Sequence, residues 1–402
     1  MASASHCKRL RRNGILNLTA ALQAAALLAT AVWGADVPLH FLAANDDSVA
    51  PFPPNTVSLY AIAADGTLTN PARVSTGGNG MAGGYFGASR ILIAPRGSEA
   101  CIYASNSQSE TISSIDVRTL KLAGVFHGSH SDNKLASDGI GLAGSDTHLY
   151  AAFSGSGNIG TFRIRPDCAL EFVGDLHAQG LNGGPAEGMA IHGNLLVAAY
   201  GDGSIESFNI SGGMPVSNGD AQFDAGAKAD CVSDAVDITR DGHFAILGCG
   251  STASAVEISD ISSGKLTPTV AYNLGVAWNS GSVRLSPDER LLYISNSSGG
   301  RITAAFFDKA TGKVRPGCTS RPLRGFYSKY AYIGAVATEL AAGTGGLLYV
   351  PELGTDNKSY IGLLRFTQTA NGCTLTETAN SPVAGSQATA WLSIGVYPPR
   401  PF

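Results

Sequence analysis

The stretch SPDERLLYISN at residues 286–296 shows the pattern that decides the fold of this 402-residue chain. A proline-containing turn precedes a run of apolar and aromatic residues of the kind that fills a buried β-strand. Hydrophobic pairs like Leu292-Tyr293 recur at Ile102-Tyr103, Leu149-Tyr150, Leu196-Val197, Ala245-Ile246 and Leu348-Tyr349. The second members of successive pairs are 47, 47, 49, 47 and 56 residues apart, and a weaker copy lies near Leu39–Phe41. Repeats of this length in a β-rich chain indicate a β-propeller built from four-stranded blades.

The repeats also predict where the blades lie. Around the quoted stretch, residues 282–286 form an inner strand, 291–296 the second strand and 301–307 the third. The other blades are expected at Arg90–Phe126, Ile140–Phe172, Met189–Val216, Ala235–Leu274 and Ile333–Thr378. The first blade has strands near 39–45 and 56–62, and residues 390–397 supply its missing inner strand. The sequence predicts an all-β, seven-bladed β-propeller closed by a first blade shared between the N- and C-terminal strands. Closure leaves no strand edge to share, so we expect a monomer.

The first 34 residues differ from the rest of the chain. A basic start at Lys8, Arg9, Arg11 and Arg12 precedes an apolar run at residues 15–33. This pattern is typical of a secretory signal peptide, with cleavage expected near Gly34–Ala35 and the propeller occupying 35–402. A retained membrane anchor is the alternative, and Gln23 and Thr30 weaken it by diluting the run. We expect an exported protein, either periplasmic or secreted, with no attachment to a membrane once the signal is removed.

The charge balance excludes one class of partner. The chain has 27 Lys and Arg and 31 Asp and Glu, and removal of residues 1–34 leaves a net charge near −8. Because no basic stripe remains, we expect neither nucleic acid nor an anionic membrane as a partner.

Six of the seven cysteines remain after the signal is removed with Cys7. An even number in an exported chain predicts disulfides. Cys231 and Cys249 flank a turn almost symmetrically. Cys168, Cys318 and Cys373 fall in equivalent turns; Cys318 and Cys373 lie on adjacent blades, and Cys101 lies on the blade before Cys168. The expected pairs are Cys231–Cys249, Cys318–Cys373 and Cys101–Cys168. Free buried thiols are the alternative. No Cys-x-x-Cys spacing indicates a metal site.

Aligning the inner strands brings three acids to equivalent positions. Asp138, Glu187 and Asp234 begin the inner strands of three consecutive blades, around one mouth of the propeller. Arg90 lies at the matching point of another blade, Tyr200 in a neighbouring loop, and His127 and His130 in the loop entering the third blade. Converging carboxylates either raise one another's pKa or bind a cation. We therefore expect a small-molecule or protein ligand at this mouth and no cofactor, with a divalent cation as an alternative occupant. The simpler interpretation is that the acids cap turns and that the histidines lie in a solvated loop.

Residues 286–296 resemble the blade signature of the seven-bladed lactonase family, and DKATGKV at 308–314 resembles its next turn. This family includes bacterial 6-phosphogluconolactonase and fungal carboxymuconate cyclase, and grades into YVTN-repeat propellers. The resemblance covers about residues 36–402 and implies lactone hydrolysis. This chain departs from the family pattern, however: 281–282 (GS) replaces an Ala-Glu, and the family's usual arginines and imidazole are missing at 184–187 (GPAE) and 296–299 (NSSG). No catalytic residue carries over.

Two hypotheses follow. The first is an exported binding propeller with its ligand at the mouth framed by Asp138, Glu187 and Asp234. The second is a lactone hydrolase or related cyclase with a rebuilt site that uses these acids with His127 or His130. The export signal and the missing family residues favour the first hypothesis, and the resemblance favours the second.

Overall fold

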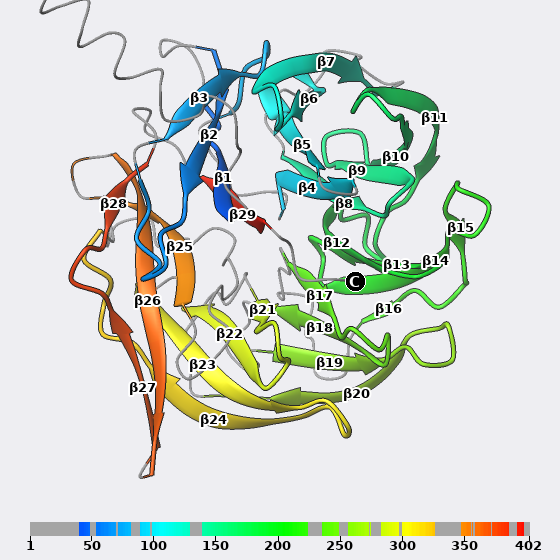
Figure 1. Ribbon diagram of the computed structural model, residues 1–402. Helices are drawn as coiled ribbons and strands as arrows, with labels where there is room; N and C mark the ends of the chain where they lie inside the picture. Colours follow the sequence, from blue (N-terminus) through cyan, green and yellow to red (C-terminus); the bar gives the residue numbers. More distant parts are fainter. Residues whose placement is uncertain are drawn as a thin grey trace, which may run out of the picture. The chain divides into compact units, whose positions relative to one another are not determined.

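A computed structural model of the chain gives seven β-sheets arranged as the blades of a propeller (Figure 1). It describes residues 40–48, 54–69, 71–81, 89–96, 99–128, 139–223, 235–248, 256–272, 274, 283–296, 300–325, 347–354, 356, 358–370, 372–385 and 392–397. The chain divides into two compact units, Met1–Pro38 and Leu39–Phe402, and all described residues belong to the second. None of the described residues forms a helix long and apolar enough to cross a bilayer.

Blades 1 to 4 follow the chain in order, each written from its inner to its outer strand. Blade 1 consists of β29 (Ser393–Tyr397), β1 (Phe41–Asn45), β2 (Thr56–Ala61) and β3 (Ala72–Ser75). Blade 2 consists of β4 (Ile91–Arg96), β5 (Glu99–Asn106), β6 (Thr111–Asp116) and β7 (Lys121–His127), with a short 3-10 turn at Ser107–Ser109. Blade 3 consists of β8 (Ile140–Gly144), β9 (His148–Phe153), β10 (Asn158–Ile164) and β11 (Leu170–His177). Blade 4 consists of β12 (Ala186–His192), β13 (Leu195–Tyr200), β14 (Ser204–Asn209) and two short outer strands, β15 (Val216–Ser217) and β16 (Gln222–Phe223).

The remaining blades complete the ring. Blade 5 consists of β17 (Val236–Ile238), β18 (Phe244–Gly248), β19 (Val256–Asp260) and β20 (Thr267–Tyr272). Blade 6 consists of β21 (Val283–Leu285), β22 (Leu291–Asn296), β23 (Arg301–Asp308) and β24 (Lys313–Thr319). Blade 7 contains β25 (Leu347–Leu353), β26 (Ser359–Thr369), β27 (Gly372–Glu377) and β28 (Val383–Ala384). The inner strand expected for blade 7 after Ile333 lies outside the described residues.

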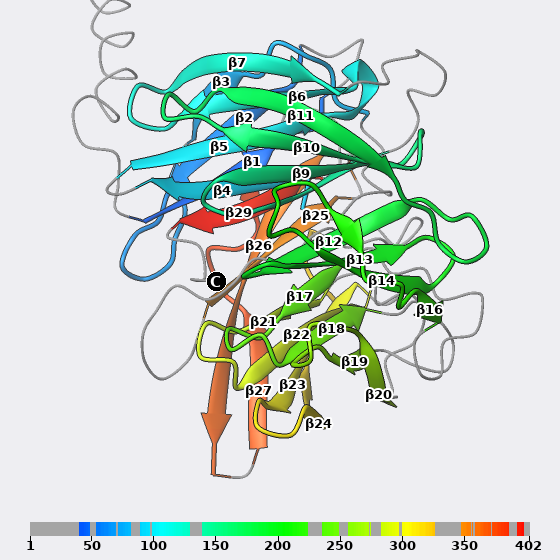
Figure 2. The same ribbon diagram turned by 90° about the vertical axis from the view of Figure 1, so that its right-hand side faces the viewer.

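The ring closes as the sequence predicts. Strand β29, from the C-terminal end, pairs antiparallel with β1 in the register Phe41↔Tyr397 to Asn45↔Ser393. The rings of Phe41 and Tyr397 stack with their centroids 5.0 Å apart. The outermost strands of successive blades also approach each other, as β7 and β11 do in Figures 1 and 2. The prediction of a first blade shared by both ends of the chain is confirmed.

The repeating hydrophobic pairs lie on the second strands because the two members of a pair face opposite sides of a blade. Leu149 packs into the cluster between blades 2 and 3, whereas Tyr150 packs into the cluster between blades 3 and 4. The hydroxyl of Tyr150 donates to the carbonyl of Gly213 in the next blade at 2.7 Å. Burial raises the pKa of Tyr150 to about 12, so this hydroxyl stays a donor. One pair per repeat therefore joins each blade to both of its neighbours.

Tyr349 repeats this arrangement across the closing seam. Its hydroxyl donates to the carbonyl of Gly66 in blade 1 at 2.7 Å. Gly66 adopts φ +89°, and a Cβ there would lie 1.9 Å from the Leu347 side chain, so both the backbone and the packing require glycine at this turn.

Two disulfides join neighbouring blades. Cys101–Cys168 links blades 2 and 3, and Cys318–Cys373 links blades 6 and 7, as expected. Cys231 and Cys249, the third expected pair, lie outside the described residues. Disulfides form and persist in oxidising compartments, and two of them fit such an environment.

Candidate functional site

The candidate site lies at the end of the ring where second strands end and inner strands begin, which we call the mouth end. In blade 2, for example, Ile91 of β4 pairs with Ala104 near the end of β5. Loops from different blades meet here, so residues distant in sequence become neighbours.

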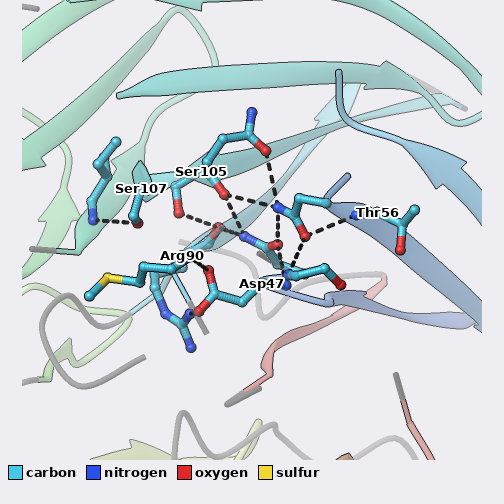
Figure 3. Close-up of polar contacts among 11 residues, drawn as sticks. Asp47, Thr56, Arg90, Ser105 and Ser107 are labelled. Carbon is cyan, nitrogen blue, oxygen red and sulfur yellow. Dashed lines mark hydrogen bonds and ion pairs between the residues drawn. The ribbon is translucent and has the colours of Figure 1, made fainter. Parts of the chain in front are cut away.

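A buried amide network joins blades 1 and 2 at the mouth end (Figure 3). The side-chain amide of Asn45 donates to the carbonyls of Arg90 at 3.1 Å and Ser105 at 2.9 Å. The amide of Asn55 donates to the side-chain oxygens of Asn45 at 2.9 Å and Asn106 at 3.0 Å. All of these side chains are buried, and each bond crosses a loop or a blade boundary. The network therefore fixes how the first two blades meet.

An ion pair lies beside this network. Arg90 Nη1 is 2.7 Å from Asp47 Oδ2, and the two side chains are 2% and 0% exposed. The other Asp47 oxygen, Oδ1, accepts the backbone N–H of Met81 at 3.2 Å. Asp47 and Ser89 have φ values of 51° and 58°, in the left-handed region that non-glycine residues rarely adopt. Such conformations persist only where the surroundings hold them, so the pair is a rigid, pre-built feature.

One position near the end of the second strand carries a polar group in at least three blades. Ala44, Ala104 and Val350 pair with Ser58, Ser113 and Gly362 in blades 1, 2 and 7. The residue two positions after each of these is Asp46 in blade 1, Asn106 in blade 2 and Glu352 in blade 7. The sequence reasoning reached this position at Tyr200 of blade 4 but did not single out Asp46 or Glu352, and the register of the strands is what makes the equivalence visible.

The three residues at this position have different partners. Asp46 Oδ2 accepts the hydroxyls of Thr56 at 2.5 Å and Ser58 at 2.7 Å. Asn106 Nδ2 donates to the hydroxyls of Thr111 at 3.0 Å and Ser113 at 2.7 Å. Glu352 makes no such bond in the described part of the chain, because blade 7 has Gly362 where the other blades have a serine.

Burial raises the pKa of the Asp46 and Glu352 carboxyls. Desolvation raises the pKa of Asp46 to about 6, against the lowering effect of the Thr56 and Ser58 hydroxyls. Desolvation, helped by the nearby Glu377 carboxylate, raises the pKa of Glu352 to about 8. Asp46 thus titrates near pH 6, and Glu352 holds a proton at neutral pH.

The structure places the site residues proposed from the sequence in different surroundings. Arg90 lies at the mouth end as expected, but its charge is paired with Asp47. Glu187 begins the inner strand of blade 4 at a β-bulge between Ala186 and Gly188, and is 3% exposed. A Cβ on Gly201 would lie 2.4 Å from Glu187 Oε1, so glycine makes room for this carboxylate. Bulges of this kind redirect side chains beside binding sites. Asp138, Asp234 and His130 lie outside the described residues.

Two expected positions are corrected. Tyr200 ends β13 at the mouth end, but it is 0% exposed and packs between blades 3 and 4. Its hydroxyl donates to Glu206 Oε2 at 2.9 Å, so this residue is not presented to a ligand. His127 is an exposed residue at the end of β7, the outermost strand of blade 2. It therefore lies at the rim of the ring rather than around its axis, because the outer strand of a blade is the one farthest from that axis.

A surface pocket of about 310 Å³ lies at the opposite end, between the turns of blades 5 and 6. It is lined by Arg240, Asp241, Pro287, Asp288, Glu289 and Lys309. Its acids are held within the turns: Asp241 accepts the Thr239 hydroxyl at 2.7 Å, and Asp288 accepts the Ser286 hydroxyl at 2.7 Å. The pocket thus has structural partners for its acids and is separate from the mouth end. No group of three or more His, Cys, Asp or Glu with metal-site geometry occurs within the described ranges.

The fold is that of a seven-bladed β-propeller, and several solved propellers resemble it. A putative 6-phosphogluconolactonase from Bacteroides uniformis matches with a TM-score of 0.64 at 14% identity, over 88% of this chain and 99% of that one. A functionally unknown protein from Desulfotomaculum acetoxidans gives 0.60 at 13% identity, over 88% and 98%. The periplasmic gluconolactonase PpgL of Pseudomonas aeruginosa gives 0.52 at 14% identity, over 69% and 80%. No family model and no curated protein matches the sequence. The likeness to 6-phosphogluconolactonase-like proteins is therefore one of fold.

Proposed function

We propose that this protein is an exported lactonase-like propeller that binds a ligand at its mouth end and does not hydrolyse lactones. Lactone opening develops negative charge on the carbonyl oxygen, which needs a cation or hydrogen-bond donors, and it needs a base to activate water. Arg90 is the buried cation among the described residues at the mouth end, and Asp47 already pairs with it at 2.7 Å, the two side chains being 2% and 0% exposed. This sequestered charge is the observation that carries the proposal.

The expected ligand has hydrogen-bond donors. Glu187 lies at a bulge at the mouth end, where it is 3% exposed and is reached by a ligand only after neighbouring side chains move; the sequence predicts Asp138 and Asp234 as its counterparts in the neighbouring blades. Carboxylates accept hydrogen bonds, so a polyhydroxylated small molecule or a protein loop rich in donors suits them. A divalent cation is the alternative occupant. The two disulfides support export.

Lactone hydrolysis is the second candidate, and two buried carboxyls of unequal acidity, at equivalent positions of blades 1 and 7, favour it. An enzyme that opens a lactone uses a base near neutral pH and a protonated acid, and Asp46 and Glu352 have pKa values of about 6 and about 8. Both carboxyls are 3% exposed or less, so a substrate would reach them only after the mouth end rearranges.

The test uses a panel of sugar lactones and the matching open-chain polyols. Calorimetric titration measures binding, and acid release at constant pH measures hydrolysis, with and without divalent metal. We expect saturable binding of at least one polyol or lactone, no enzymatic acid release, and loss of binding in Glu187→Gln. The matched control is Glu171→Gln, which removes a carboxylate from an exposed pair with Arg163 on the outer part of blade 3. Lactone turnover that disappears in Asp46→Asn or Glu352→Gln would establish the second candidate instead.

A further inference from the structure

Glu352 stands apart among the buried acids. Its side chain is 3% exposed, and among the described residues neither carboxyl oxygen has a side-chain hydrogen-bond partner; the backbone N–H of Gly325 is the one hydrogen-bonding group that lowers its pKa. A buried carboxylate with so few partners is costly, because both desolvation and unmade hydrogen bonds oppose the charge. The position therefore favours the neutral form of the acid.

Two glycines shape the space around this carboxyl. A Cβ on Gly362 of β26 would lie 1.8 Å from Glu352 Oε1, and a Cβ on Gly325 would lie 2.4 Å from Oε2. Gly325 belongs to the segment that follows blade 6, and Gly362 belongs to blade 7. The carboxyl is thus enclosed where the two blades meet. A side chain at either position would collide with the carboxyl, so both positions need glycine while Glu352 is enclosed there.

The charged groups that act on Glu352 are Glu377 and Arg324. Arg324 is already engaged: its backbone N–H donates to Glu377 Oε2 at 2.9 Å, and its Nε is 3.2 Å from the same oxygen. Its guanidinium also donates to the carbonyl of Thr378. Arg324 therefore neutralises Glu377 first, and none of the other described residues forms an ion pair with Glu352.

We propose that Glu352 is a proton-binding site and that its proton keeps blades 6 and 7 packed together. Loss of the proton places a second negative charge beside Glu377 in a space from which water is excluded. The segment at Arg324 and Gly325 is the one that must move to admit water or a cation. This site is independent of the ligand proposed for the mouth end.

The direction of the pH dependence follows from where the carboxyl titrates. Its pKa is about 8 in the folded protein against 4.5 as the usual value, and burial is the larger cause. A raised pKa means that the folded protein binds more protons than the unfolded chain. The stabilisation is complete below about pH 4.5 and is lost as the pH rises through about 8.

The direct test is a titration of ¹³C-labelled glutamate carboxyls by NMR in the intact protein, with the Glu352 signal assigned by its absence from Glu352→Gln. We expect this carboxyl to titrate with a midpoint near pH 8. Glu377→Gln removes the like charge and is expected to lower that midpoint. Denaturant unfolding from pH 5 to pH 9 supplies the second readout: Glu352→Gln should flatten the decline seen in the parent protein, and Glu171→Gln should leave it unchanged.

The proposal is overturned if the assigned carboxyl titrates near pH 4.5, or if the parent protein and Glu352→Gln lose stability in parallel. Should Glu352→Gln fail to fold, the signal is assigned through its shift in Glu377→Gln, and the midpoint in the parent protein decides the question alone.

Discussion

Two boundaries between blades, called seams here, differ in whether their buried charges are paired. The 1–2 seam, formed by Asn45, Asp47, Asn55, Arg90, Ser105 and Asn106, pairs its charges and links its amides in a network. The 6–7 seam, formed by Arg324, Gly325, Glu352, Gly362 and Glu377, leaves one carboxyl without a side-chain partner among the described residues. The fold is the same at both places, so the side chains alone keep the charges of the first seam paired and make the second seam responsive to pH near 8.

The largest expected effect comes from breaking the ion pair of the 1–2 seam. Arg90→Met leaves the Asp47 carboxylate buried without its cation, which costs roughly 3–5 kcal/mol of unfolding free energy. Denaturant unfolding at pH 7 measures it. The control is Arg163→Met, which breaks an exposed pair with Glu171 and should cost less than about 1 kcal/mol. Equal losses of unfolding free energy in the two variants would show that the buried ion pair contributes no more to stability than the exposed one.

The next effect tests whether Asp46 behaves as a buried acid. Asp46→Asn gives blade 1 the residue that blade 2 has at the equivalent position, where Asn106 donates to two hydroxyls. The raised pKa of about 6 means that native stability falls as pH rises from about 4 through 6. The variant should show no such fall in unfolding free energy. In the parent protein the fall is at most roughly 3 kcal/mol, which is the pKa shift of Asp46 converted to free energy. Unfolding curves at pH 4, 6 and 8 check it, and a slope unchanged by the substitution would contradict the account.

A smaller loss is expected from the amide network. Asn45→Ala removes the donor to the carbonyls of Arg90 and Ser105 and the acceptor for Asn55. Leaving buried polar groups unpaired costs about 1–3 kcal/mol. The matched change is Asn218→Ala, whose half-buried amide donates to the Ser207 hydroxyl at 2.8 Å and the Gly264 carbonyl at 3.2 Å and should cost less than a fully buried amide. Thermal and denaturant unfolding compare the two variants.

The smallest effect concerns the two disulfides, which lie in different surroundings. Cys101 and Cys168 are 1% and 3% exposed, whereas Cys318 and Cys373 are half-buried on outer strands. Because thiol–disulfide exchange needs access to sulfur, mild reductant should open Cys318–Cys373 first. Differential alkylation followed by mass spectrometry reports the order, and earlier labelling of Cys101 would reverse this expectation.

The repeat pattern predicted most of the fold because each hydrophobic pair is local and recurs. Ile102-Tyr103 and Leu348-Tyr349 lie on second strands, the ends of the chain close blade 1, and two of the expected disulfides form. These features depend on spacing alone. The architecture could therefore be predicted from the sequence without knowing any side-chain contact.

The site was harder to predict because its contacts join different blades. Asn45 bonds Ser105 across 60 residues, and nothing in the local sequence of either residue signals the partner. Tyr200 was misplaced because its ring direction depends on which face of the blade it occupies. Glu352 had a usable signal: it follows Tyr349 by three residues, as Asn106 follows Tyr103. The usable signal was that blade 7 has an acid, Glu352, where blade 2 has an amide, Asn106.

Hydrogen exchange at pH 6 and pH 9, corrected for intrinsic rates, tests the contrast between the seams most directly. Peptides covering 323–325, 347–353 and 359–369 should lose protection at the higher pH, while peptides covering 41–45, 55–61 and 91–106 keep theirs. Equal changes in both sets, or a change confined to the second set, would contradict the account.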